Sequence, residues 1–85
     1  MIGGAIAGHL IAIWIDRECE ISTGHFESAK ALYVAWRGFA RRRGEAPGSP
    51  ADFAGEMERR GFTWDRLPGD RRRIRWGIRL RGARR

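Results

Sequence analysis

Arginine is the residue type in this sequence that is best suited to contacting a partner, and it occurs in clusters. Lys30 is the only lysine among the 17 basic residues. The guanidinium group is planar and permanently charged, so it can contact phosphate through two hydrogen bonds and stack on bases. Ten clustered arginines are therefore candidate DNA-binding residues: Arg41, Arg42, Arg43, Arg59, Arg60, Arg66, Arg71, Arg72, Arg73 and Arg75.

The positive charge lies mostly in the second half of the chain. The formal net charge is +7 and the isoelectric point is about 11.4. Met1–Trp36 holds two basic residues against four acidic ones, a net charge of −2, whereas the remainder holds fifteen against six, a net charge of +9. A one-sided basic half is typical of polyanion-binding proteins and favours nucleic acid as the partner. A solvated basic surface, or a genome that encodes arginine in place of lysine, would give a similar composition.

Other reactive residues give weaker signals. The residues able to bind zinc match no familiar ligand spacing, and they are His9, Glu18, Cys19, Glu20 and His25. The carboxylates near Cys19 are typical of the polar end of a helix rather than of an acid–base pair. We therefore expect no cofactor, no metal, no small-molecule substrate and no enzymatic activity. Cys19 has no second cysteine to pair with and is expected to be a small buried apolar residue.

Two tryptophans near the basic clusters, Trp64 and Trp76, could stack on unpaired bases. Tryptophans at alternating positions of a small hairpin are more often part of its core. We therefore expect both side chains to be buried.

Three helices are expected to position these residues. Apolar residues at helical spacing predict the first at about Ala5 to Cys19. Ser28 is a predicted N-cap for a second helix that runs to Arg43 and stops at Gly44. Ser49-Pro50 predicts the start of a third helix, which ends at Arg60 before Gly61. Between the first two helices we expect a turn at Ser22–Gly24 and a short strand at His25–Glu27.

The apolar pattern changes from period 3.6 to period 2 after Gly61, which predicts a β-hairpin over Phe62–Leu80 with a turn at Pro68–Asp70. Alternation places Ile74, Trp76, Ile78 and Leu80 on an apolar face and Arg73, Arg75 and Arg79 on the opposite face. The predicted fold is therefore α+β, a winged helix-turn-helix of three helices with a C-terminal β-hairpin wing. In such folds the third helix enters the major groove and the wing lies along the DNA backbone.

Several sequence segments resemble the C-terminal domain of phage and plasmid primases related to the poxvirus primase-helicase. They are Trp14–Glu20, Ser28–Tyr33 with Trp36, the run Ser49, Phe53, Met57, Arg60-Gly61-Phe62, and Trp76–Leu80. The resemblance covers roughly Ile13 to Leu80. It implies a winged-helix module that holds DNA beside a primase-helicase. The sequence has no Gly-x-x-x-x-Gly-Lys-Ser/Thr phosphate-binding loop, so we expect the module alone, either free-standing or part of a longer primase.

The third helix departs from what this resemblance implies, because basic or polar groups are expected on its exposed face. Here that face holds Ala51 and Gly55, with acidic Asp52, Glu56 and Glu58 nearby. We therefore expect binding through the DNA backbone, with duplex favoured over single strands and little discrimination between sequences.

Two further hypotheses remain open. One is a protein-interaction module that docks through its apolar N-terminal helix, with an exposed patch near Ile2, Ile6 and Leu10. The other is RNA binding, which arginines suit equally well. In either case the 85 residues form one domain, with fraying at residues 1–8 and a flexible basic tail at residues 82–85. Met1–Ile15 is too short to span a bilayer and lacks a basic leader, which favours a cytoplasmic protein with no membrane partner.

Overall fold

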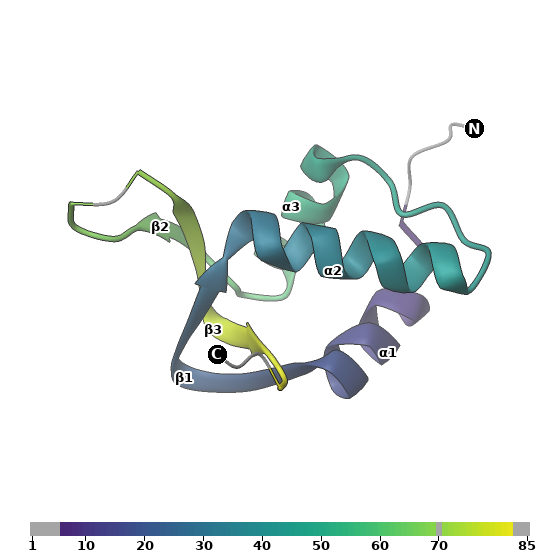
Figure 1. The fold of residues 1–85 in the computed structure, drawn as a ribbon, viewed down its shortest axis with the longest axis horizontal. Helices are drawn as coiled ribbons and strands as arrows, with labels where there is room; N and C mark the ends of the chain where they lie inside the picture. Colours follow the sequence, from purple (N-terminus) through teal and green to yellow (C-terminus); the bar gives the residue numbers. More distant parts are fainter. Residues whose placement is uncertain (1–5, 70, 83–85) are drawn as a thin grey trace.

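The chain folds into a small α+β unit (Figure 1). The computed structural model describes residues 6–69 and 71–82. Within these residues the chain forms three helices and a three-stranded antiparallel sheet with the strand order β1-β3-β2. The elements are α1 (Gly8–Glu18), β1 (Cys19–Ser28), α2 (Ala29–Arg42), α3 (Pro50–Arg59), β2 (Trp64–Arg66) and β3 (Arg73–Leu80). The predicted α+β class, with three helices followed by a hairpin, is confirmed.

Local capping defines the starts of α2 and α3, as the sequence predicts. The Ser28 hydroxyl accepts a hydrogen bond from the Ala31 N–H at 3.1 Å. At α3 the Ser49 hydroxyl accepts from the Asp52 N–H at 3.0 Å, and the Ser49 N–H donates to the Asp52 carboxylate at 3.1 Å. These bonds satisfy N–H groups that lack a partner within the helix.

The first helix is shorter than expected and the strand after it is longer. Helix α1 ends at Glu18 because Cys19 already pairs with Leu80 across β1 and β3. Ala5 at the predicted start of the first helix, residues 83–85 of the predicted tail at 82–85, and Asp70 of the predicted turn lie outside the described residues.

The turn predicted at Ser22–Gly24 is wrong, because these residues belong to β1. They nevertheless mark an irregularity. Ile21 pairs with Ile78 and Phe26 pairs with Trp76, so four residues of β1 lie opposite Gly77 alone. Such an insertion bends a strand, and Figure 1 shows β1 turning sharply on its way from α1 to α2.

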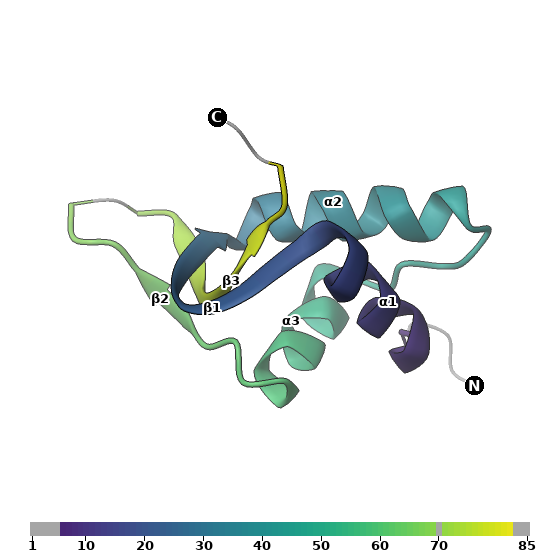
Figure 2. The same ribbon diagram turned by 90° about the horizontal axis from the view of Figure 1, so that it is seen from below.

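Aromatic side chains fill the core between the three helices. Trp14, Trp36 and Phe53 pack with ring centroids 5.7–6.4 Å apart. Leu32 and Met57 are fully buried beside them. This core fixes α1, α2 and α3 against one another. The hairpin end formed by β2 and β3 projects beyond the helices in both views (Figures 1 and 2).

Candidate nucleic-acid interface

One face of the hairpin carries an exposed tryptophan beside two arginines. Trp64 pairs with Arg75 across β2 and β3, and Arg66 pairs with Arg73. Side chains of directly paired residues, and of residues two apart along a strand, share a face of the sheet. The guanidinium carbons of Arg73 and Arg66 lie 5.2 Å and 6.0 Å from the Trp64 ring centroid. The hairpin therefore presents aromatic and cationic groups side by side.

Arg75 does not belong to the exposed part of this face, so the prediction that its side chain projects from the hairpin is wrong. Only 6% of the residue is exposed. Its guanidinium donates to the Phe62 carbonyl at 2.8 Å and forms an ion pair with Glu58 of α3. Both contacts hold the charge inside the protein, where phosphate cannot reach it.

The reason is an interruption in the alternation of β3. Arg75 and Ile78 are both buried although they are three residues apart, and Gly77 between them has φ +91°. This conformation is accessible to glycine and strained for other residues. Strict alternation therefore fails at Gly77, so that Arg75 and Ile78 are both buried while Trp76 between them is 37% exposed.

The expectation of two buried hairpin tryptophans is also wrong. Trp64 is 51% exposed and Trp76 is 37% exposed. They have different surroundings. Trp76 packs edge-on against Phe26 and donates its indole N–H to the Asp65 carboxylate at 3.0 Å, a bond that is the main cause of the lowered pKa of Asp65. Trp64 instead faces a groove.

This groove lies between α2, α3 and the hairpin and has a volume of about 730 Å³. Helix α2 supplies one wall, with Tyr33 and Val34 among its residues. The N-terminal part of α3 contributes Phe53, Ala54 and Gly55, and the hairpin wall includes Trp64. Tyr33 is held in place because its hydroxyl donates to the Gly48 carbonyl at 2.7 Å. We call this hollow the α2–hairpin groove.

Positive groups from separate elements border the α2–hairpin groove. Lys30 and Arg37 line it from α2, and Arg73 lines it from β3. A smaller hollow of about 340 Å³ adjoins it at the start of α2, lined by Ser28, Ala29, Lys30, Arg72 and Arg73. The start of a helix carries partial positive charge, which adds to the attraction for anions there.

Lys30 and Arg37 were not among the ten arginine-cluster candidates. A signal for them exists in the sequence, because Lys30, Val34, Arg37 and Arg41 recur at intervals of four, three and four residues. That spacing places them along one face of a helix. Which face of α2 stays open, however, depends on how α3 and the hairpin pack.

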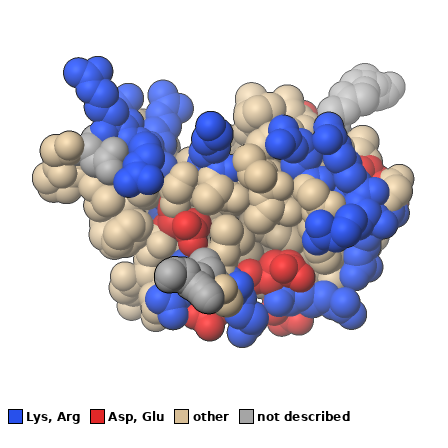
Figure 3. Space-filling view, in the orientation of Figure 1, with Lys and Arg blue, Asp and Glu red and all other residues tan. Residues whose placement is uncertain are grey.

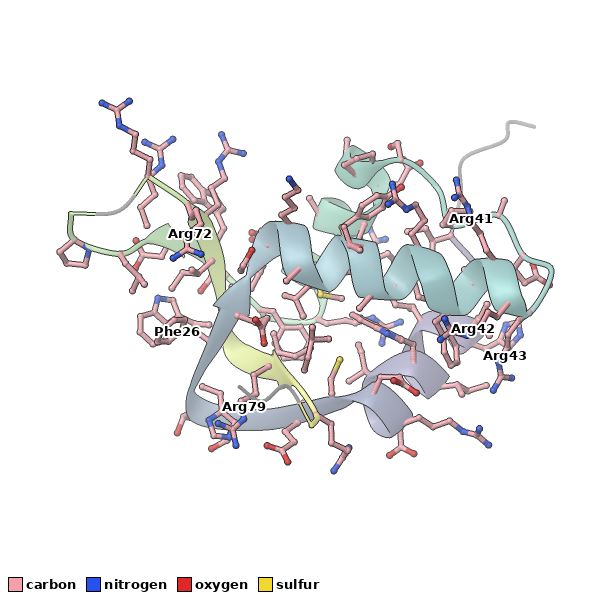
Figure 4. The ribbon with its side chains drawn as sticks, viewed as in Figure 1. Phe26, Arg41, Arg42, Arg43, Arg72 and Arg79 are labelled. Carbon is pink, nitrogen blue, oxygen red and sulfur yellow. The ribbon has the colours of Figure 1, made fainter. Side chains whose placement is uncertain are left out.

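Arg41, Arg42 and Arg43 lie apart from the hairpin. Figure 4 shows all three at the end of α2 that is distant from Arg72. Arg43 stacks on Phe39, with its guanidinium carbon 4.6 Å from the ring centroid. Cations at the end of a helix also interact favourably with its dipole. In the space-filling view basic side chains accordingly gather at both ends of the long axis (Figure 3).

Arg59 and Arg60 are exposed, yet acidic and backbone groups of the protein engage both. Arg59 forms an ion pair with Glu56, and Arg60 lies 3.7 Å from the same carboxylate. Arg60 also donates to the Gly8 carbonyl of α1 at 3.1 Å. The structure therefore separates these two candidates from Arg66, Arg71, Arg72 and Arg73, which are exposed at the hairpin.

The described residues offer little for metal chemistry. Across residues 6–69 and 71–82 there is no group of three or more His, Cys, Asp or Glu residues placed to hold a metal ion. Cys19 is 2% exposed, which confirms that it is a small buried residue. Burial, together with the nearby Glu18 carboxylate, raises the pKa of its thiol to about 12. The thiol is therefore protonated at neutral pH and a weak nucleophile.

The described residues of the first helix do not form the expected apolar patch. Leu10 is 5% exposed, and Ile6 packs against the core. Ile2 lies outside the described residues. No helix in the described part of the chain is long and apolar enough to cross a membrane.

Comparison of the chain with known protein families, with curated proteins and with solved structures gives no match.

Proposed function

We propose that this chain is a winged-helix DNA-binding module that contacts the DNA backbone through its hairpin and is not an enzyme. The order helix, strand, helix, helix, strand, strand, with the last strand central in the sheet, fits a winged helix-turn-helix. In this proposal α3 is the helix near the major groove and β2–β3 form the wing.

The observation that carries the proposal is the alignment of cations across the α2–hairpin groove. Arg66 and Arg73 stand on the exposed hairpin face, and Lys30 and Arg37 stand on the facing wall. DNA backbone phosphates lying along this surface would contact positive groups from both α2 and the hairpin. Each phosphate contact releases counterions from the nucleic acid, which favours binding.

The resemblance to the C-terminal domain of phage and plasmid primases supports the same proposal. It extends over residues 13–80, which include the whole sheet and most of α1. We propose that the module serves a primase-helicase of this kind by holding DNA beside it.

The test compares two triple variants that remove equal charge. Arg66, Arg71 and Arg73 are changed to alanine in one, and Arg41, Arg42 and Arg43 in the other. Affinity for a blunt random-sequence duplex is measured from low to physiological salt. If the four hairpin arginines contact phosphate, the wild-type slope of log affinity against log salt is about −3.6. The hairpin variant should lose on the order of 2–4 kcal/mol of binding at low salt and flatten the slope by two to three.

The control variant should lose less, because its arginines lie at the far end of α2. Circular dichroism verifies that both variants are folded. Equal losses in the two variants would show that net charge alone drives binding. A salt-independent affinity would refute the proposal, and a clear preference for an RNA duplex over DNA would favour the RNA-binding alternative.

A further inference from the structure

Trp64 is the most exposed tryptophan of the described chain, and its surroundings are unusual for a surface aromatic residue. Its ring lies beside the guanidinium groups of Arg66 and Arg73. It also lines the α2–hairpin groove together with Tyr33 and Val34, and Val34 is 44% exposed. An exposed, open apolar surface of this kind is most often a binding site.

Charges of both signs line the groove, and the positive groups outnumber the single carboxylate. Lys30, Arg37 and Arg73 contribute positive groups to its lining, whereas Glu58 contributes a carboxylate whose side chain is 45% exposed. Glu58 pairs with the buried Arg75, so the negative group is held in place on α3. A ligand that fits this lining has anionic groups for the arginines and Lys30, and a flat uncharged part for the aromatic and apolar surface.

We propose that the α2–hairpin groove binds an unpaired nucleobase stacked on Trp64, with the flanking phosphates on the arginines and Lys30. The inference rests on the proposed DNA-binding function and extends it. The module then prefers DNA that has a single-stranded segment next to a duplex over DNA that is fully paired. Stacking on aromatic side chains suits any base, because each has a π face.

A nucleobase fits better than the side chains of an acidic peptide. A peptide carboxylate entering the groove would approach Glu58, whose charge Arg75 offsets only in part, whereas a base brings no charge. The exocyclic amino group of cytosine or adenine could even donate to that carboxylate. Arg66 and Arg73 lie together on the hairpin-tip side of Trp64, where they could contact a phosphate next to a stacked base.

The experiment uses three DNA probes and the intact protein. The probes are a blunt duplex, the same duplex with a short thymine overhang, and the same overhang made of abasic units, which keeps the phosphates and removes the bases. The wild-type protein should bind the thymine overhang roughly fivefold or more tightly than the blunt duplex. The abasic overhang should bind only slightly better than the blunt duplex.

Two substitutions at Trp64 and one at Trp76 identify the site. Trp64→Leu should abolish the preference, so that this variant binds the thymine-overhang and blunt probes equally tightly. Trp64→Phe should retain most of the preference, because it keeps an aromatic ring. Trp76→Leu is the matched control on the same strand pair and should keep the preference. Thermal melting verifies that each variant is folded.

The possible failures can be told apart. If wild-type protein binds all three probes equally and with the expected salt dependence, this inference is wrong and the proposed function stands. If Trp64→Leu, folded, keeps the overhang preference, the groove is not the base-binding site. If no probe binds but a peptide of alternating glutamate and leucine does, the proposed function fails, and this inference fails with it.

Discussion

Trp14 and Trp36 occupy the centre of the core, and both are fully buried, but only one has a hydrogen-bond partner for its indole N–H. The Trp36 N–H donates to the Pro47 carbonyl at 2.8 Å. The Trp14 N–H is buried with no partner in the described structure. A buried donor without a partner costs free energy that a hydrogen-bonded one does not.

Replacing each of these tryptophans by phenylalanine should therefore have unequal effects. Both changes remove similar volume from the core. Trp36→Phe also leaves the Pro47 carbonyl without its donor, whereas Trp14→Phe removes a polar group that was unsatisfied. We expect Trp36→Phe to lower the free energy of unfolding by about 1 kcal/mol more than Trp14→Phe does. Urea denaturation of the two variants measures the difference, and equal losses would contradict this reading of the two N–H groups.

At the scale of elements, Arg75 and Glu58 connect β3 to α3. Changing Arg75 to methionine keeps most of the side-chain volume but leaves the buried Phe62 carbonyl without its donor. We expect a loss of about 1–3 kcal/mol in the free energy of unfolding. Glu58→Gln should cost less, because that side chain is 45% exposed and solvent can replace part of the interaction. If Arg75→Met unfolded at the same urea concentration as wild type, the connection would contribute nothing to stability.

A second connection between elements depends on pH. The Arg79 Nε donates to the Glu20 carboxylate at 2.9 Å, joining β3 to β1. This hydrogen bond lowers the pKa of Glu20 below its ordinary value of 4.5. A carboxyl group whose pKa is lower in the folded state stabilises the protein above its unfolded pKa, and the effect is lost as pH falls through the folded pKa.

Glu20→Gln should therefore reduce stability at neutral pH, and the gap from wild type should close as pH falls below about 4.5. Thermal melting between neutral and acidic pH measures that gap. Glu45→Gln makes the same charge change in the exposed loop before α3 and should show no such closing. A constant gap for Glu20→Gln would rule out the contribution of the ion pair.

Which elements are predictable from the sequence depends on whether their causes are local. The starts of α2 and α3 follow from Ser28 and Ser49, whose side chains bond to residues three positions away. The burial of Arg75 has no local cause. It depends on contacts with the Phe62 carbonyl and with Glu58 of α3, which no residue pattern within β3 predicts.

At the scale of the whole molecule, the candidate site is assembled from three elements. The exposed arginines at the hairpin were predictable from clustering alone. The α2–hairpin groove was not, because its walls come from segments that are adjacent only after folding. Lys30 and Arg37 become candidates once that packing shows which face of α2 remains open.

The composition of α3 predicts that the protein discriminates little between duplex sequences. Ala51 and Gly55 are exposed on α3 and have little to offer base edges. We expect discrimination among duplex sequences to stay within roughly tenfold. The double change Ala51→Ser and Gly55→Ala should barely alter duplex affinity, and a Cβ at position 55 has open space around it. A selection from random duplexes checks this, and a single sharp motif would contradict it.

The contact between Arg75 and Glu58 also bears on how quickly a partner can be captured. Because it holds β3 against α3 in the unbound protein, the entropy of orienting the hairpin is lost during folding rather than during association. A partner then meets a surface that needs only small side-chain adjustments. For the proposed polyanion partner, we expect a binding rate set by diffusion and long-range charge, which falls as salt screens the attraction to the arginines.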